Sequence, residues 1–161
     1  MTPAWKTGLV AAGAALVVAV SGALVTDLSP WYYGLRKPAF QPPDWLFGPA
    51  WTLIFGLAAF SGATAWLASP NRTTRGWILG LFGFNIVLNI FWSLLFFRLK
   101  RPDWALFESY FLWASVAALI WALFPRSKRA AWLLVPYLAW VTFATVLNMA
   151  IVQLNAPFGT P

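Results

Sequence analysis

The sequence contains no cysteine and no histidine, and it has only four acidic residues. Without cysteine there is no disulfide framework, no thiolate nucleophile and no cysteine-ligated metal site. Without histidine, the commonest general base and metal ligand is missing. These absences argue against a hydrolase, a zinc enzyme or an iron–sulfur protein. We therefore predict no metal site and no required cofactor.

Charge is scarce as well. Charged residues make up 9% of the 161 residues, whereas a soluble domain carries roughly 25%. Hydrophobic residues make up 61% of the chain, which is enough for five segments of the ~20 residues that cross a bilayer as a helix. The composition therefore excludes an ordinary water-soluble domain and intrinsic disorder.

Five apolar runs, separated by short polar breaks, predict an all-α membrane protein: a single domain over residues 1–161, folded as a five-transmembrane-helix bundle. The first run also has features of a cleaved signal peptide, with Lys6 before it and Ala19-Val20-Ser21 near its end. Its apolar stretch is long for such a peptide, and we expect a helix. The predicted helices cover about 5–25, 45–67, 76–97, 104–124 and 130–154.

A longer first loop, about 26–44, contains four prolines and is not helical throughout. Asp44 is placed to cap the second helix. Lys and Arg residues number six at one set of loop ends and five at the other, so the positive-inside rule favours neither orientation. The net charge of +7 predicts contact with anionic membrane lipid, and the scattered cations do not indicate a nucleic-acid partner.

Polar side chains inside the apolar runs are costly in lipid. Asn85 and Asn89 share one face of the third run, and Glu108 is the only acidic residue within a run. Two interpretations are compatible. These side chains form hydrogen bonds between helices, or they line a polar-tipped cavity and orient a ligand.

Aromatic residues are abundant: 12 Trp, 14 Phe and 4 Tyr. Belts at the two membrane interfaces account for part of the tryptophan content. Trp51 and Phe55 lie at helical spacing in the second run, and Trp140 and Phe143 do so in the fifth. Each stripe faces lipid or packs in the bundle core, or it forms a wall for a flat aromatic ligand.

Small residues at four-residue spacing let helix backbones approach closely. Gly76, Gly80 and Gly83 lie near the start of the third run, and Ala15, Ala19 and Ala23 lie in the first. The glycines are the candidate seam of a homodimer, with packing inside one bundle as the alternative.

The first loop carries the longest motif of the chain. It resembles the signature of the TspO/MBR family, which comprises the tryptophan-rich sensory proteins and the mitochondrial translocator protein (peripheral benzodiazepine receptor). Segments of the third, fourth and fifth runs, 89–97, 104–108 and 136–148, are similar to the family as well. The motif reads Trp31-Tyr32-x-x-Leu35-x-Lys37-Pro38-x-x-x-Pro42-Pro43-x-Trp45-x-Phe47-x-Pro49-x-Trp51.

The resemblance implies a five-helix bundle, often dimeric. The lack of cysteine fits a location in the cell envelope of a bacterium. The resemblance implies binding of tetrapyrroles such as protoporphyrin IX, with sterol-like and benzodiazepine-receptor ligands as further classes. The function would be that of a sensor, regulator or carrier. The implied pocket walls lie between the helices beneath the first loop and are Tyr32, Trp51, Phe55, Asn89, Trp92, Ser93, Trp140, Ala144 and Leu147.

The resemblance also suggests chemistry. Trp51 and Trp140 match tryptophans that the family links to light-dependent porphyrin breakdown, so a light- and oxygen-dependent porphyrin-degrading enzyme is the alternative function. Transport is a third reading, although no inverted repeat is visible. Arg36 and Lys37 are placed to meet the propionates of a porphyrin.

One feature of the animal members is missing. Their sterol-recognition stretch has a Tyr after the Leu-Asn pair, followed by an Arg. Here Met149 follows Asn148, and no Lys or Arg occurs after Arg129. With only Met149 and tyrosines left as axial ligands, we expect a preference for the metal-free ring.

Overall fold

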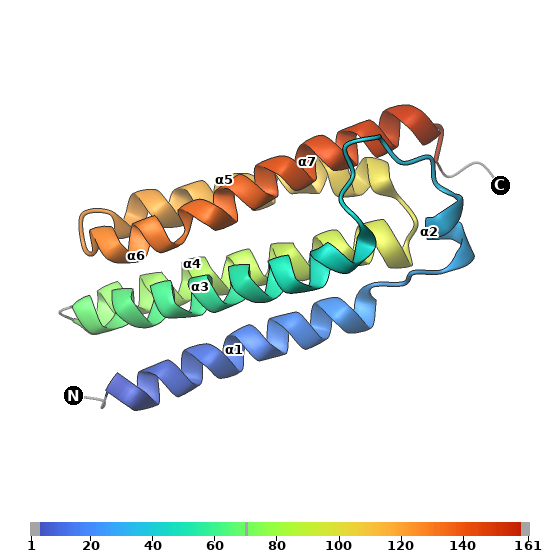
Figure 1. Cartoon of the computed structure of the whole chain (residues 1–161). Coiled ribbons are helices and arrows are strands. Elements are labelled where there is room, and N and C mark those ends of the chain that lie inside the picture. Colours follow the sequence, from blue (N-terminus) through green and yellow to red (C-terminus); the bar gives the residue numbers. More distant parts are fainter. Residues whose placement is uncertain (1–3, 70, 159–161) are drawn as a thin grey trace.

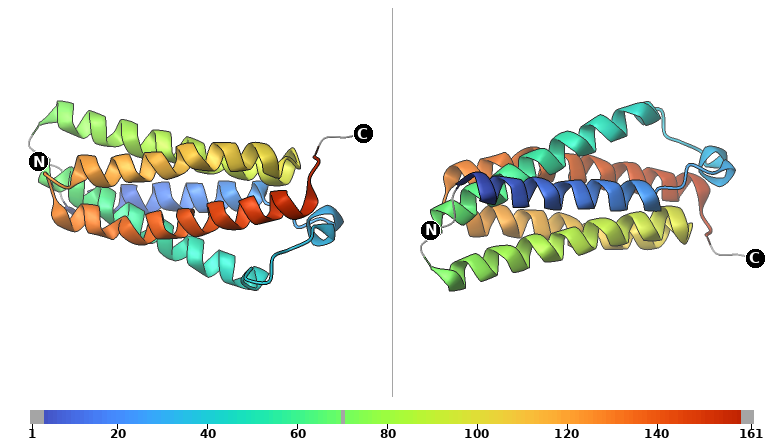
Figure 2. Two further views of the ribbon diagram at one scale, coloured as in Figure 1. Left: turned by 90° about the horizontal axis from the view of Figure 1, so that it is seen from above. Right: turned by 90° about the horizontal axis from the view of Figure 1, so that it is seen from below.

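The structure is a computed structural model that describes residues 4–69 and 71–158. Five long helices lie side by side and alternate in direction (Figures 1 and 2). Within the described residues all five are long and apolar enough to cross a membrane, which confirms the predicted five-helix bundle. They are α1 (Ala4–Val25), α3 (Phe47–Ala68), α4 (Arg72–Ser93), α5 (Pro102–Leu123) and α7 (Val135–Asn155).

Four short helical segments complete the fold. α2 lies in the first loop and η1 leads into α3, while α6 precedes α7. A π-helical turn, η2, continues α4 and buries Leu95 and Phe96. The bounds are α2 (Pro30–Gly34), η1 (Asp44–Leu46), η2 (Leu94–Arg98) and α6 (Lys128–Leu133).

Local capping chemistry explains where the helices differ from the predicted ranges. The third helix begins at Arg72, four residues before the expected start, because the Asn71 side chain accepts a hydrogen bond from the Thr74 N–H. The fifth run is divided at Leu134, since Pro136 stands in the first turn of α7 and has no N–H to continue α6. Pro70, in the predicted turn between α3 and α4, lies outside the described residues.

The expectation that Asp44 caps the second helix is wrong. Asp44 opens η1, and its carboxylate accepts hydrogen bonds from Tyr32 and Gln41 instead. The Asp44 side chain, which was predicted to cap the helix, therefore forms hydrogen bonds within the first loop instead.

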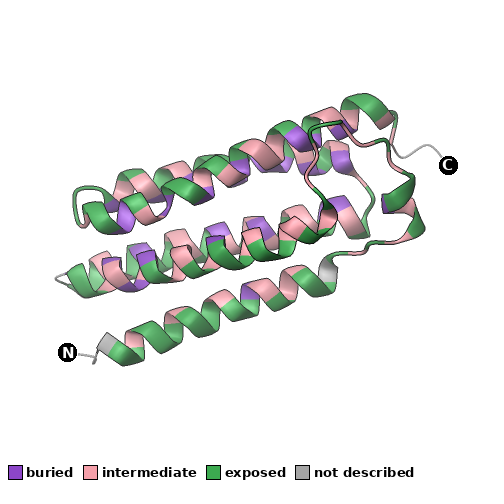
Figure 3. Cartoon of the chain, in the orientation of Figure 1, coloured by how far each residue is buried: buried purple, intermediate pink, exposed green. Residues whose placement is uncertain are grey.

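The outer surface of the bundle is apolar, as a lipid-facing surface must be. Trp121 is 82% exposed, Val10 73% and Trp77 71%. Figure 3 shows that exposed residues dominate α1, whereas the buried ones concentrate where α3, α4, α5 and α7 face each other. The buried polar side chains Asn85, Asn89 and Glu108 lie in this interior.

The bundle has two distinct ends. Loop one (residues 26–46), η2 and the last turn of α7 lie at one end, called here the loop-one end (Figure 1). The start of α1, the end of α3 and α6 lie at the opposite end.

Candidate functional site

The two predicted aromatic stripes meet between α3 and α7. Trp51 stacks on Phe55, with ring centroids 5.2 Å apart. The indole of Trp51 also meets Trp140 edge to face, at 6.3 Å and 85°, and meets Tyr137 at 6.2 Å. Helical spacing places Trp51 and Phe55 on one face of α3, and packing against α7 turns that face into half of an aromatic cluster.

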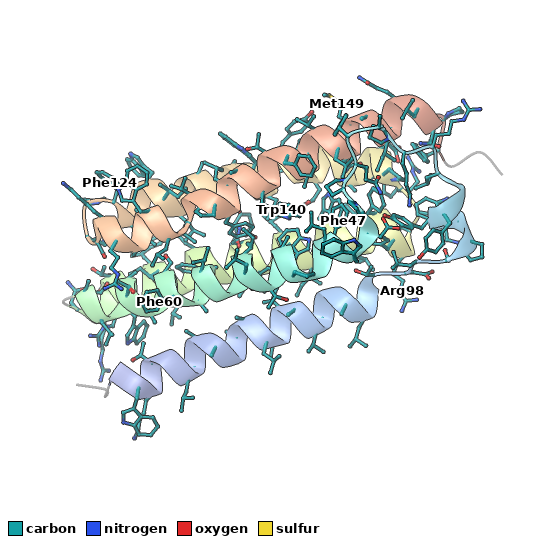
Figure 4. All side chains as sticks on the ribbon, viewed as in Figure 1. Phe47, Phe60, Arg98, Phe124, Trp140 and Met149 are labelled. Atoms are coloured by element: carbon teal, nitrogen blue, oxygen red, sulfur yellow. The ribbon has the colours of Figure 1, made fainter. Side chains whose placement is uncertain are left out.

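Two phenylalanines extend this cluster toward loop one. Phe47, in the first turn of α3, lies 5.9 Å from Trp140, and Phe143 lies 5.6 Å from it. Phe40 of loop one reaches Phe143 at 6.5 Å. Figure 4 shows Phe47 and Trp140 next to each other in the loop-one half of the bundle. Phe47 belongs to the family-like motif and Phe143 to the aromatic stripe of the fifth run, but neither is among the nine predicted wall residues.

A second cluster lies directly under loop one. Trp92 stacks on Phe96 at 5.1 Å, and Tyr32 lies 5.8 Å from Phe97. Tyr32 and Leu147 are both buried in this cluster. Phe47 and Phe143 pack against it as well, so they connect the two clusters. The predicted wall residues Tyr32, Trp51, Trp92, Trp140 and Leu147 are thus brought into one continuous aromatic region.

Loop one is held over this region by polar contacts. The Tyr32 hydroxyl donates to Asp44 Oδ1 at 2.8 Å, and the Lys37 ammonium lies 3.5 Å from Asp44 Oδ2 and 4.0 Å from the Tyr32 ring centroid. Burial, and then the neighbouring Asp44 carboxylate, raise the pKa of the Tyr32 phenol above its ordinary value. Of the two predicted propionate contacts, Lys37 is therefore already paired, whereas Arg36 is exposed.

A polar network joins three helices beneath the aromatic region. The Tyr137 hydroxyl donates to Asn85 Oδ1 at 3.1 Å and accepts from Asn89 Nδ2 at 3.2 Å. Asn85 Nδ2 donates to Ser115 Oγ at 2.8 Å. The interhelical hydrogen bonds predicted for Asn85 and Asn89 are therefore present, and they link α4 to α5 and α7. Tyr137, whose hydroxyl is a polar group within an apolar run, is their shared partner and was not among the predicted site residues.

Glu108 differs from the asparagines. It is 4% exposed, and neither carboxyl oxygen has a hydrogen-bond partner among the described residues. The prediction that Glu108 forms a hydrogen bond between helices is therefore wrong for the part of the chain that the structure describes.

A cavity of about 340 Å³ lies between α1, α3 and α4. Its inner end is formed by Phe55, Asn85, Asn89 and Tyr137. Of the nine predicted wall residues, Phe55 and Asn89 line it. Ser93 lies one helical turn after Asn89, and its hydroxyl donates a hydrogen bond to the Asn89 backbone carbonyl. Ala144 is half-buried on α7. Phe55 thus belongs to both the cavity and the aromatic region.

The sequence of this bundle matches a known family. A family model described as TspO/MBR matches residues 9–154. The chain belongs to the TspO/MBR family. The resemblance drawn from the loop-one motif is confirmed, and the match includes all five long helices.

Named relatives of the TspO/MBR family share much of the chain. Tryptophan-rich protein TspO of Archaeoglobus fulgidus is 39% identical over 145 residues, covering 89% of this chain and 93% of the relative. Tryptophan-rich sensory protein of Cereibacter sphaeroides is 34% identical, covering 94% and 92%. Translocator protein of Homo sapiens is 34% identical, covering 75% and 72%. The chain is therefore a multi-pass membrane protein of this family, which includes proteins named as sensors and translocators.

Proposed function

We propose that this TspO/MBR protein binds a tetrapyrrole, protoporphyrin IX, in the aromatic region between α3, α4 and α7, and acts as a sensor or carrier in a bacterial cell envelope. One observation carries the proposal. The indole N–H of Trp140 is buried beside Trp51 and has no acceptor among the described residues. A buried donor without a partner costs about 1–3 kcal/mol, and an acceptor on a bound ligand would remove that cost.

The surrounding surface suits a flat macrocycle. Aromatic rings bury large areas and pair by stacking or by edge-to-face contact. Trp51 and Trp140 contact each other edge to face. A macrocycle would enter by separating these two indoles. One indole would then stack on each face of the macrocycle, in place of the edge-to-face contact between the indoles.

The route for this opening starts at Phe55. This ring lines the cavity and stacks on Trp51, so the cavity already reaches the aromatic region. At the loop-one end, the exposed Arg36 would meet one carboxylate of the ligand. The Lys37 ammonium would bind the second carboxylate of the ligand after releasing the Asp44 carboxylate.

A titration of the purified protein with protoporphyrin IX in the dark, followed by tryptophan quenching, tests the proposal. We compare wild type with Trp51→Phe/Trp140→Phe and with Arg36→Ala/Lys37→Ala. The matched control is Trp77→Phe/Trp121→Phe, which removes two exposed indoles from the outer surface. A non-absorbing competitor of the benzodiazepine-receptor class separates binding from optical artefacts.

We expect saturable micromolar binding in wild type and in the control, weakened by at least about ten-fold in the two site variants, since each loses more than ~1.4 kcal/mol of contact. Equal, non-saturable quenching in all four proteins would show partitioning into detergent and would contradict the proposal.

A second function is favoured by the contact between Trp51 and Trp140 themselves. Two indoles whose ring centroids are 6.3 Å apart can pass one electron to a photo-excited porphyrin, which passes it on to dioxygen to form superoxide. The indole cation radical then takes an electron back from the ring, so the net change is one electron from porphyrin to dioxygen. The ligand then supplies the difficult chemistry. Loss of porphyrin absorbance under light, faster than in protein-free solution and slowed in Trp51→Phe/Trp140→Phe, would support degradation. Equal rates would leave binding as the function.

A further inference from the structure

The cavity between α1, α3 and α4 is made by small side chains. Ala11, Ala14 and Ala15 of α1 line it, and Gly62 and Ala63 of α3 face them. A Cβ atom added at Gly62 would lie 3.6 Å from the Phe82 ring, in ordinary van der Waals contact, so any larger side chain there would take up space between α3 and α4. The space is a consequence of several small residues meeting at one place in the fold.

The cavity has the length of one lipid chain. Its lining on α1 extends from Lys6 to Val18, a span of ~18 Å at 1.5 Å per residue. Half of the ~30 Å hydrocarbon thickness of a bilayer is ~15 Å. Its volume of about 340 Å³ is at the lower end of the ~300–1,000 Å³ of ligand pockets, which suits one narrow chain better than a macrocycle.

The cavity opens toward the membrane. Val10 of α1 and Leu79 of α4 both line it, and they are 73% and 59% exposed. Both residues belong to the apolar outer surface, which faces lipid. A chain can therefore enter sideways from the bilayer between α1 and α4.

The mouth of the cavity is cationic. Lys6 lines it at the opposite end of the bundle, and so does Trp66, over whose ring the Arg75 guanidinium lies at 5.1 Å. The Arg75 Nε is buried without an acceptor among the described residues. Within the part of the chain that the structure describes, no carboxylate lies at this end. Asp27, Asp44 and Asp103 are at the loop-one end and Glu108 is inside the bundle.

The inner end offers little to a polar ligand. Asn85, Asn89 and Tyr137 are hydrogen-bonded to one another, and Phe55 closes the remaining space. A hydrocarbon terminus fits this end without breaking the network.

From these features we propose that the cavity holds one acyl chain of an anionic membrane phospholipid, whose phosphate is bound by Lys6 and Arg75. The phosphate would satisfy the unpaired guanidinium nitrogen through a charge-assisted hydrogen bond. This site shares Phe55 with the proposed tetrapyrrole site, but its cationic mouth lies at the opposite end of the bundle, and the proposal does not depend on tetrapyrrole binding.

Native mass spectrometry of the full chain in detergent tests the site, with phosphatidylglycerol and phosphatidylcholine of identical chains as probes. The variants are Lys6→Gln/Arg75→Gln, which removes the charges, and Ala59→Leu, which fills the cavity. The matched controls are Arg126→Gln/Lys128→Gln at the same end and Ala118→Leu on the exposed face of α5. Circular dichroism confirms that each variant is folded.

We expect wild type and both controls to retain one phosphatidylglycerol in preference to phosphatidylcholine. In the charge variant, the ratio of retained phosphatidylglycerol to phosphatidylcholine should fall about five-fold for each charge removed, because one cation near a phosphate contributes ~1 kcal/mol. Ala59→Leu should lose both lipids, and Trp51→Phe/Trp140→Phe should retain phosphatidylglycerol as wild type does.

Three results would overturn the proposal. The first is wild-type retention in Ala59→Leu, and the second is an equal loss of preference in the Arg126→Gln/Lys128→Gln control. The third is retention of free oleate with no retention of phosphatidylglycerol, which would assign the cavity to a fatty acid instead.

Discussion

The side-chain amide of Asn155 forms two hydrogen bonds of 2.8 Å with the backbone of Arg36, donating to its carbonyl and accepting from its N–H. The residues are 119 positions apart in the chain. The last turn of α7 therefore fixes loop one at the point where Arg36 is presented to solvent.

Asn155→Ala should free this part of loop one. The two hydrogen bonds contribute about 1 kcal/mol in a partly exposed setting, so we expect limited trypsin cleavage after Arg36 to become about five-fold faster. Gln153→Ala, at an exposed position on the same helix, is the control. An unchanged cleavage rate in Asn155→Ala would mean that aromatic packing alone holds the loop.

Tyr137→Phe should destabilise the bundle. The change leaves Asn85 Oδ1 and Asn89 Nδ2 without their shared partner, and interhelical hydrogen bonds in membranes average ~0.6 kcal/mol each. We expect a loss of about 1–2 kcal/mol in the free energy of unfolding, measured by titration with a denaturing detergent. Tyr110→Phe, at an exposed tyrosine of α5, should change it by less than ~0.5 kcal/mol.

Glu108→Leu should stabilise the protein. Both carboxyl oxygens are buried and have no hydrogen-bond partner among the described residues, so replacing the group with an apolar one removes a desolvation cost of about 1–3 kcal/mol. The same detergent titration measures the change. A lower free energy of unfolding in Glu108→Leu would reveal that the carboxyl group is satisfied by an internal water or a bound cation.

Gly80→Leu tests the proposed homodimer seam. Gly80 and its neighbours Gly76 and Gly83 are exposed on α4. Apart from the adjoining residues and backbone of α4 itself, no described atom lies within 4 Å of a Cβ atom added at any of them. The fold of one chain should therefore tolerate leucine, while a partner helix packed on this face would not.

Light scattering after size exclusion measures the oligomeric state, with Gly56→Leu as a control at an equally open position on α3. We expect Gly80→Leu to be monomeric and Gly56→Leu to match wild type. A dimer that persists in Gly80→Leu would place the seam on another face.

Local sequence determined the helices and the faces they carry. Runs of about 20 apolar residues have to be helical in a bilayer because each backbone group must find its partner within the segment. Helical spacing then put Trp51 with Phe55, and Trp140 with Phe143, on common faces. The start at Arg72 and the break at Leu134 were missed, since each depends on a single capping or proline position that a hydropathy pattern does not resolve.

Tertiary packing decided which of these faces meet. Asp44 pairs with Tyr32 rather than capping a helix, and Asn155 binds a loop 119 residues away, because these choices depend on distances that only the folded chain defines. The cavity between α1, α3 and α4 follows from the volume that small residues on three helices leave unfilled. The number of membrane helices and their aromatic faces therefore follow from local sequence, whereas the contacts between the helices and the cavity they leave follow from the packing of the whole bundle.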